Sequence, residues 1–206
     1  MTASLSNPAD IVNASLVRIG WKKSIGNLYD GSAASQLALR VYGQVRDELL
    51  RKMEPGFSMR NLAMTLLKSA PPGGYIPAVT PWNPATNPPV GWLFSYQYPP
   101  DCLKVRAVKP TPLFFPNVDP QPYVFSIDND SAYAPPQRVV LCNVANALLV
   151  YTGRVTNPQT MDVGFLEALT ATLGERLAPA LTGLDAAKLE AAETQGETAM
   201  AEMEQG

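Results

Sequence analysis

The side chains that most often perform chemistry are sparse in this sequence. Its 206 residues include no histidine, which excludes a Ser–His or Cys–His catalytic pair and a histidine-bound zinc site. The two cysteines, Cys102 and Cys142, are too few for a disulfide framework or a four-thiolate metal site, and we expect both to be free thiols. The sequence therefore predicts no catalytic, cofactor-binding or metal-ligating residue, and no cofactor.

Two short motifs come close to known sites but lack residues that those sites need. Gly73-Gly74 is not followed by the Lys-Ser/Thr of a nucleotide-binding loop. Asp128-Asn129-Asp130-Ser131 resembles the beginning of a calcium loop, without the later glycine and the bidentate glutamate. We interpret this run as a plain turn.

Carboxylates leave one enzymatic hypothesis open, because a cell-wall hydrolase can work with a pair of Asp or Glu side chains. The aspartates considered for this role fall on separate predicted turns without a recognisable partner: Asp101, Asp119, Asp128, Asp130 and Asp162. The sequence therefore favours a protein that is not an enzyme, and a carboxylate-dependent hydrolase is the alternative.

The charge of the chain is nearly balanced but unevenly spread. A formal net charge of -2 excludes a strongly basic nucleic-acid binder and disfavours a DNA-binding regulator. Residues 1–70 carry 9 basic and 5 acidic side chains, whereas residues 155–206 carry 2 and 9. A basic beginning and an acidic end favour contact with a charged partner, such as another copy of the chain.

Proline separates two helical flanks from an extended middle, because 16 of the 20 prolines lie between Pro71 and Pro136. The flanks have apolar residues at helical spacing, and the first helix has the start signals Asn7, Pro8 and Asp10. The predicted helices cover residues 8–19, 32–53, 58–68, 165–181 and 185–206. The third of them should bury Leu62 and Leu66.

Alternating side chains predict strands in the middle of the chain, over residues 92–98, 103–108, 123–127 and 138–142. Residues 144–151 are ambiguous between helix and strand. The expected fold class is mainly α: a helical bundle with a small antiparallel β-sheet around residues 92–142, a long Pro-rich loop and a C-terminal amphipathic helical arm. Residues 1–184 would form the core and residues 185–206 the acidic arm.

Two segments are candidate contact sites. Residues 71–91 form a long Pro-rich loop with apolar anchors at Tyr75, Ile76 and Trp82, which we expect to contact a neighbouring subunit or another protein. The arm has an apolar stripe that could lie in a groove of a partner. This stripe consists of Leu189, Ala192, Ala199, Met200 and Met203.

Several stretches, taken in order, resemble the head-to-tail adaptor proteins of tailed bacteriophages, also called tail tubular protein A-like or portal accessory proteins. They lie at residues 9–20, 28–31, 92–105, 149–155, 165–169 and 177–183. The run Tyr96-Gln97-Tyr98-Pro99-Pro100-Asp101-Cys102-Leu103 is similar to one that joins two strands in that family. The stretch Glu54–Ser58 departs from the family pattern and keeps only Phe57 of a Trp-Asn-Phe-like run.

The resemblance implies a structural protein of the virion, assembled in the host cytoplasm. Such proteins form a ring, typically a dodecamer, beneath the portal; the ring extends the DNA channel and provides the platform for the tail. The implied partners are the portal protein, a tail nozzle or tube protein and other copies of the chain. Genomic DNA would pass through without sequence-specific binding, and no membrane is expected. The arm would reach the portal, and the alternative becomes a phage-associated cell-wall hydrolase.

Overall fold

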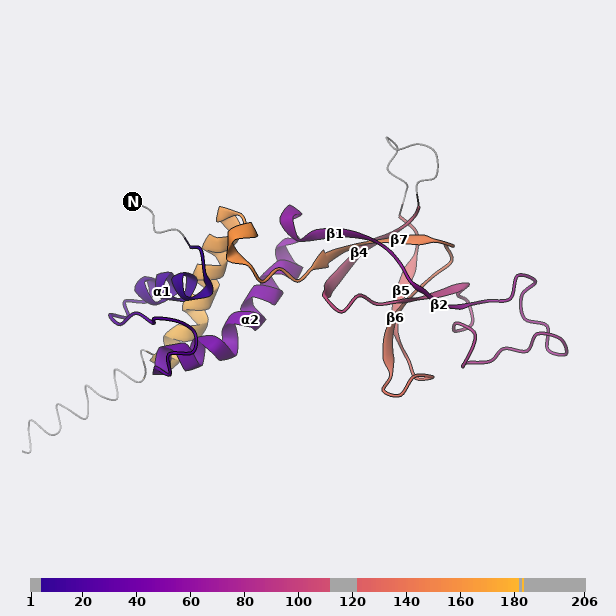
Figure 1. Ribbon diagram of the computed structural model, residues 1–206, viewed down its shortest axis with the longest axis horizontal. Helices are drawn as coiled ribbons and strands as arrows, with labels where there is room; N and C mark the ends of the chain where they lie inside the picture. The colour runs from indigo at the N-terminus through magenta and orange to yellow at the C-terminus, as the bar shows by residue number, and fades with distance from the viewer. Residues whose placement is uncertain (1–4, 112–121, 182, 184–206) are drawn as a thin grey trace, which may run out of the picture. The chain divides into compact units, whose positions relative to one another are not determined.

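The chain divides into two compact units in the computed structural model, which describes residues 5–111, 122–181 and 183 (Figure 1). One unit comprises Met1–Lys52 and Val155–Gly206, and the other comprises Met53–Arg154. We call them the helical unit and the sheet unit. The sheet unit is thus inserted into the sequence of the helical unit.

The fold is mixed rather than mainly α, so the predicted fold class is wrong. The described residues include 3 helices, with 35% of residues helical and 26% in strands of two antiparallel sheets. The strands begin at Met59 and end at Gly153, well beyond the expected range of 92–142. Residues 58–68, whose composition favours a helix, lie largely in strands instead.

Local signals set the boundaries of the first two helices. Helix α1 (Pro8–Arg18) begins with a capping box in which Asn7 and Asp10 bond each other's backbone N–H groups. Gly20 follows the helix at φ 77°, a left-handed conformation that glycine adopts without strain. Helix α2 (Ala33–Met53) closely matches its predicted range. A third helix covers residues 163–181 and confirms the helix predicted there.

The helical unit is held by leucine-rich faces and one close backbone approach. The third helix buries Phe165, Leu166, Leu169, Leu173, Leu177 and Leu181. A Cβ at Gly174 would lie 3.3 Å from the carbonyl oxygen of Ser15 in α1, so a glycine permits this approach. Arg176 on the third helix and Glu48 on α2 form an exposed ion pair at 3.1 Å.

The sheet unit contains two antiparallel sheets, which we call sheet A and sheet B. Sheet A has the order β1-β7-β4, with β1 at Met59–Ala63, β7 at Ala147–Gly153 and β4 at Cys102–Pro110. Sheet B has the order β2-β3-β6-β5, with β2 at Leu66–Ser69, β3 at Phe94–Gln97, β6 at Gln137–Cys142 and β5 at Phe125–Asp130. Along each strand, buried and exposed side chains alternate only in part.

One hydrophobic core joins side chains of both sheets. It includes Tyr96 and Val140 of sheet B with Val108 and Leu149 of sheet A. The Tyr96 hydroxyl donates to the Val144 carbonyl oxygen at 2.8 Å, so this buried polar group is satisfied. The later part of the segment 144–151, ambiguous in sequence, lies in β7 at the centre of sheet A.

Two local predictions in this unit are wrong. Residues 58–68 do not form a helix: a short 3-10 helix η1 (Gly56–Ser58) leads into β1, and β2 follows. Leu62 and Leu66, expected to be buried, are 41% and 50% exposed. Pairing with β7 and β3 satisfies this backbone in place of helical hydrogen bonds, so tertiary pairing overrides helix propensity.

The second wrong prediction is the turn at residues 128–130. These residues are the last three of β5 and pair with Val139, Arg138 and Gln137 of β6. The chain turns after them, over residues 131–136, where the peptide bond Ala134–Pro135 is cis. The strands predicted at 92–98, 103–108, 123–127 and 138–142 correspond to β3, β4, β5 and β6.

The predicted C-terminal helix lies outside the described residues, and so do its stripe residues Leu189, Ala192, Ala199, Met200 and Met203. The last buried residue of the described chain is Leu181. Within the described part of the chain, no helix combines the length and apolar character that crossing a membrane requires.

Candidate functional site

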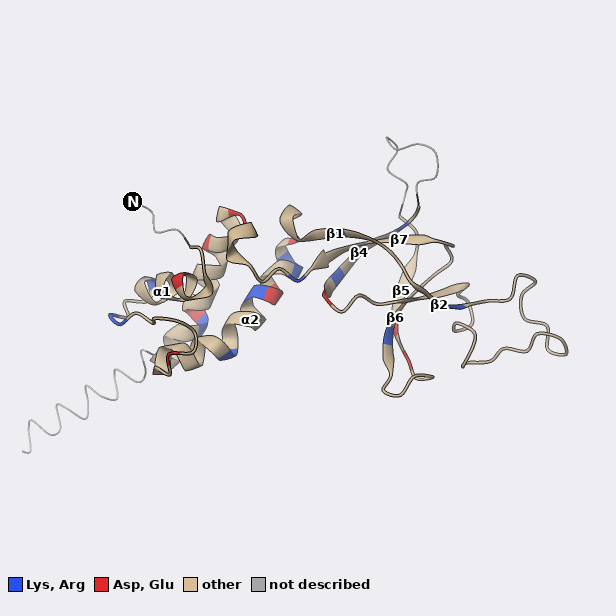
Figure 2. Cartoon of the chain, viewed as in Figure 1, with Lys and Arg blue, Asp and Glu red and all other residues tan. Residues whose placement is uncertain are grey.

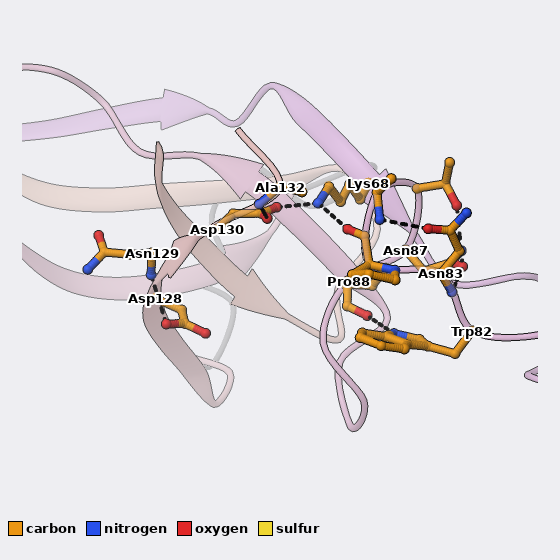
Figure 3. A network of polar contacts seen from close by, with 12 residues as sticks. Lys68, Trp82, Asn83, Asn87, Pro88, Asp128, Asn129, Asp130 and Ala132 are labelled. Carbon is orange, nitrogen blue, oxygen red and sulfur yellow. Dashed lines mark hydrogen bonds and ion pairs between the residues drawn. The ribbon is translucent and has the colours of Figure 1, made fainter. Parts of the chain in front are cut away.

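The loop of residues 71–91 is fastened to sheet B by a buried lysine. Lys68 on β2 is 5% exposed, and its ammonium group forms an ion pair with Asp130 at the end of β5. The same ammonium donates to the Pro84 carbonyl oxygen at 2.7 Å and lies 5.2 Å from the centre of the Tyr133 ring. We call this arrangement the Lys68 clamp (Figure 3).

The loop has further hydrogen bonds of its own. The Trp82 indole N–H donates to the Pro88 carbonyl oxygen at 2.9 Å (Figure 3). The side chain of Asn87 accepts from the Asn83 backbone N–H at 3.0 Å, and the Thr80 hydroxyl donates to the Gly74 carbonyl oxygen at 2.9 Å. The loop therefore has a defined conformation within a single chain.

Apolar side chains on this loop face solvent. Ile76 and Trp82 are 48% and 43% exposed, and Val79 and Val90 are 72% and 73% exposed. No charged residue lies between residues 71 and 91, and Figure 2 draws this loop wholly in tan. An ordered, uncharged loop with exposed apolar groups is suited to contact with another protein.

The three loop residues singled out from the sequence have different surroundings. Trp82 borders a cavity of about 190 Å³ beside Lys68, Asp128 and Asp130. Ile76 forms an isolated bridge with Thr80. Tyr75 is half-buried, and among the described residues its hydroxyl oxygen has no hydrogen-bond partner. Contact of any of them with a neighbouring subunit or the tail remains a prediction.

A second polar cluster lies on sheet A around Asp101. Its carboxylate is 2.7 Å from the Arg60 guanidinium and accepts from the Tyr151 hydroxyl at 3.2 Å. A Cβ on Gly153 would lie 2.5 Å from the Arg60 side chain, so this glycine leaves the space that Arg60 crosses. Burial, and then the charge of Asp101, raise the pKa of Tyr151.

The carboxylates considered for catalysis are mostly engaged in structure. Asp101 pairs with Arg60 and Asp130 with Lys68, while Asp128 accepts from the Asn129 backbone N–H at 2.8 Å. Asp162 accepts from the Phe165 backbone N–H at 2.6 Å and thereby caps the third helix. Asp119 lies outside the described residues. In the described ranges, no three Cys, Asp or Glu side chains gather as metal ligands.

The two cysteines belong to the core of the sheet unit. Both are free and buried, and burial raises the pKa of each thiol above its ordinary value. A raised pKa and a buried position make poor nucleophiles, so neither thiol is a candidate reactive group. The expectation of free thiols is confirmed.

Sequence reasoning missed the Lys68 clamp. A single lysine in a predicted helix and an aspartate in a predicted turn gave no sign of an ion pair, because 62 positions separate Lys68 from Asp130. No local signal could have shown it, because Leu66-Leu67-Lys68-Ser69 has no two-residue alternation and forms a strand only by pairing with β3.

Comparison with known proteins gives this chain no family. No family model matches it, and no curated protein is significantly similar to it.

Proposed function

We propose that this chain is a structural head-to-tail adaptor of a tailed phage, forming a ring beneath the portal that extends the DNA channel and carries the tail. The ordered loop 71–91 carries this proposal, because the Lys68 clamp holds it in place while its apolar side chains face solvent. The phage assignment itself rests on the resemblance of the sequence stretches described above. Its partners would be the portal, a tail protein and other copies of the chain.

The loop is tested with substitutions at its most exposed side chains. Val79→Asp and Val90→Asp should leave the fold intact, since both side chains are more than two-thirds exposed at 72% and 73%. Each should weaken attachment of a tail protein or a neighbouring subunit, because a charge would be buried in an apolar contact. Val163→Asp is the matched control, since Val163 is equally exposed at 72% but lies in the helical unit.

Assembly can be followed by electron microscopy of the chain mixed with portal and tail proteins. A ring on the portal that binds tail with the control but not with the loop variants supports the proposal. Tail attachment that is equal for all three variants would remove the loop from the contact. Absence of any ring on the portal would contradict the adaptor function itself.

Portal binding is assigned to the arm, residues 185–206, through the stripe of Leu189, Ala192, Ala199, Met200 and Met203. Deletion of residues 185–206 should leave the protein folded, because the described hydrophobic core ends at Leu181. The truncated chain should lose portal binding in a pull-down with purified portal. Undiminished binding would place the portal contact elsewhere.

A further inference from the structure

Strand β1 is an edge strand whose side chains are exposed on both faces. Among the described strands it pairs only with β7, and all five of its residues are exposed, including Met59 at 49% and Leu62 at 41%. Because β1 is buried on neither face, its own chain stabilises it mainly through the hydrogen-bond ladder with β7. This surface is available to another polypeptide.

The backbone of β1 has free hydrogen-bonding groups along its outer edge. The Met64 N–H donates to the Ala147 carbonyl oxygen at 3.0 Å, which fixes the phase of the antiparallel ladder. Because bonded pairs alternate in such a ladder, the N–H and C=O groups of Asn61 and Ala63 point away from β7. Within the described chain, no hydrogen bond is formed by these outward groups.

Within the described part of the chain, the usual protections of an edge strand are missing at β1. Proteins block exposed edges with proline, lysine, bulges or covering loops. Strand β1 has neither proline nor lysine, and its pairing with β7 is regular over the whole strand. Its one charged residue, Arg60, crosses Gly153 of β7 to reach Asp101 and the Arg154 carbonyl oxygen. The Arg60 side chain therefore does not cover the free edge of β1.

Sheet B ends in a second exposed edge at β5. This strand pairs only with β6 in its sheet, and its residues Ile127, Asp128 and Asn129 are exposed. Among the described residues, the Asp128 carboxylate has no ion-pair partner. The β5 edge therefore offers an apolar residue and a negative charge, whereas β1 offers apolar residues and the half-exposed Arg60.

We propose that β1 of one copy pairs with β5 of the next copy and so joins sheet A of one subunit to sheet B of its neighbour. This inference rests on the proposed ring. The two strands have similar lengths, five and six residues, and the Arg60 guanidinium, which pairs with Asp101 but is half-exposed, could also pair with Asp128 of the neighbour. A contact between two different surfaces propagates from copy to copy and can close into a ring, whereas β1 against β1 would stop at a dimer.

The backbone part of this contact is tested with Asn61→Pro. Proline at residue 61 removes an outward N–H that the β1–β7 ladder does not use, so the monomer should fold with an unchanged circular dichroism spectrum. Asn61→Ala is the matched control, because it removes the side chain and keeps the N–H. Sedimentation velocity over a wide concentration range should show association of the wild type and Asn61→Ala, weakened about tenfold or more in Asn61→Pro.

The choice of β5 as the partner is tested with Asp128→Lys, which places a positive charge opposite Arg60 and should weaken association. Asn129→Lys introduces the same lysine side chain on the other face of β5 and is the control. An effect of Asn61→Pro without an effect of Asp128→Lys, or growth that ends at two copies, would overturn the β1–β5 pairing. A folded Asn61→Pro that associates like the wild type, or a wild type that stays monomeric, would also overturn it.

These outcomes are separate from the fate of the proposed function. A chain that binds portal and tail while Asn61→Pro still forms rings is an adaptor whose subunits join by another surface. A chain that associates through β1 and β5 but binds neither portal nor tail keeps the edge pairing and loses the adaptor function.

Discussion

Lys68 is the residue that links loop 71–91 to the far strand of sheet B. Its ammonium group is buried and is shared between the Asp130 carboxylate and the Pro84 carbonyl oxygen, which lie on the sheet and on the loop. Removing only one member of such a pair leaves a charge in a poorly solvated site. The clamp therefore couples the stability of the sheet to the order of the loop.

Replacing Lys68 with methionine should destabilise the protein by about 3 kcal/mol, because Asp130 would remain without its counter-charge. Protease cleavage between residues 71 and 91 should become faster, since the Pro84 carbonyl loses its donor. Lys104→Met is the control: its ion pair with Glu54 is about half exposed, and such pairs contribute at most about 1 kcal/mol. Urea denaturation measures both, and equal losses would contradict a special role for Lys68.

The buried thiols predict a decline of stability at high pH. In the unfolded chain a cysteine loses its proton near its ordinary pKa of 9.0, whereas burial keeps Cys102 and Cys142 protonated to higher pH. The folded state then binds more protons than the unfolded state above pH 9, so the stabilisation present below that pH is progressively lost.

Each thiol can change the unfolding free energy by at most about 1.4 kcal/mol per pH unit in this window. Urea denaturation between pH 8 and pH 10.5 should show the decline, and a Cys102→Ala, Cys142→Ala double variant should show a shallower one. Identical slopes in the two proteins would assign the decline to the buried tyrosines, whose pKa values burial also raises.

Helix α2 buries most of the apolar stripe that its helical spacing predicts: Ala34, Ala38, Val45 and Leu49 are buried. The other two residues of that stripe, Leu37 and Val41, are only half-buried, while Tyr42 and Leu50 are 5% and 0% exposed. The predicted stripe was therefore largely right, and the buried face extends to an adjacent row that periodicity alone does not identify.

Leu50→Ala should therefore cost about 3 kcal/mol, the usual effect of a cavity in a packed core. Leu37→Ala in the same helix should cost about 1 kcal/mol, in keeping with its smaller buried area. Thermal unfolding of the two variants measures the difference. A larger loss at Leu37 than at Leu50 would contradict the burial of these two side chains in the structure.

The elements that could be predicted from sequence are those with strong local signals. Asn7, Pro8 and Asp10 identify the start of α1, and the leucine spacing identifies the third helix. Strand β1 could not be predicted, because its residues favour a helix and only the distant β7 makes them a strand. The candidate loop was found by its composition, but the clamp that holds it depends on contacts far apart in the chain.

At the scale of the whole molecule, the sheet unit is an insertion whose two ends lie together. Strands β1 and β7 are antiparallel neighbours, with Met59 opposite Thr152, so residues close to the entry and exit of the unit meet. The Arg154 N–H also donates to the Asp101 carbonyl oxygen at 2.8 Å, near the ion pair of Arg60. Because its two ends are adjacent, a complete folded unit can be inserted into the sequence of another unit.

Residues 53–154 expressed alone should consequently fold, because they contain both sheets and the core between them. We expect a β-type circular dichroism spectrum and a cooperative thermal transition. The helical unit, with residues 52 and 155 joined by a short linker, should give a helical spectrum. Loss of cooperative unfolding in both pieces would show that each unit needs the other.

The pairing of β1 with β7 also determines how the chain responds to tension. A force that separates residue 53 from residue 154 would act on the Met59–Thr152 end of the ladder first and open its hydrogen bonds one after another, as a zipper opens. The Arg60–Asp101 ion pair and the bond from Arg154 to Asp101 lie at that same end. The two interactions of Asp101 would therefore be among the first to break under tension. Their combined strength sets the force at which the sheet unit begins to unfold.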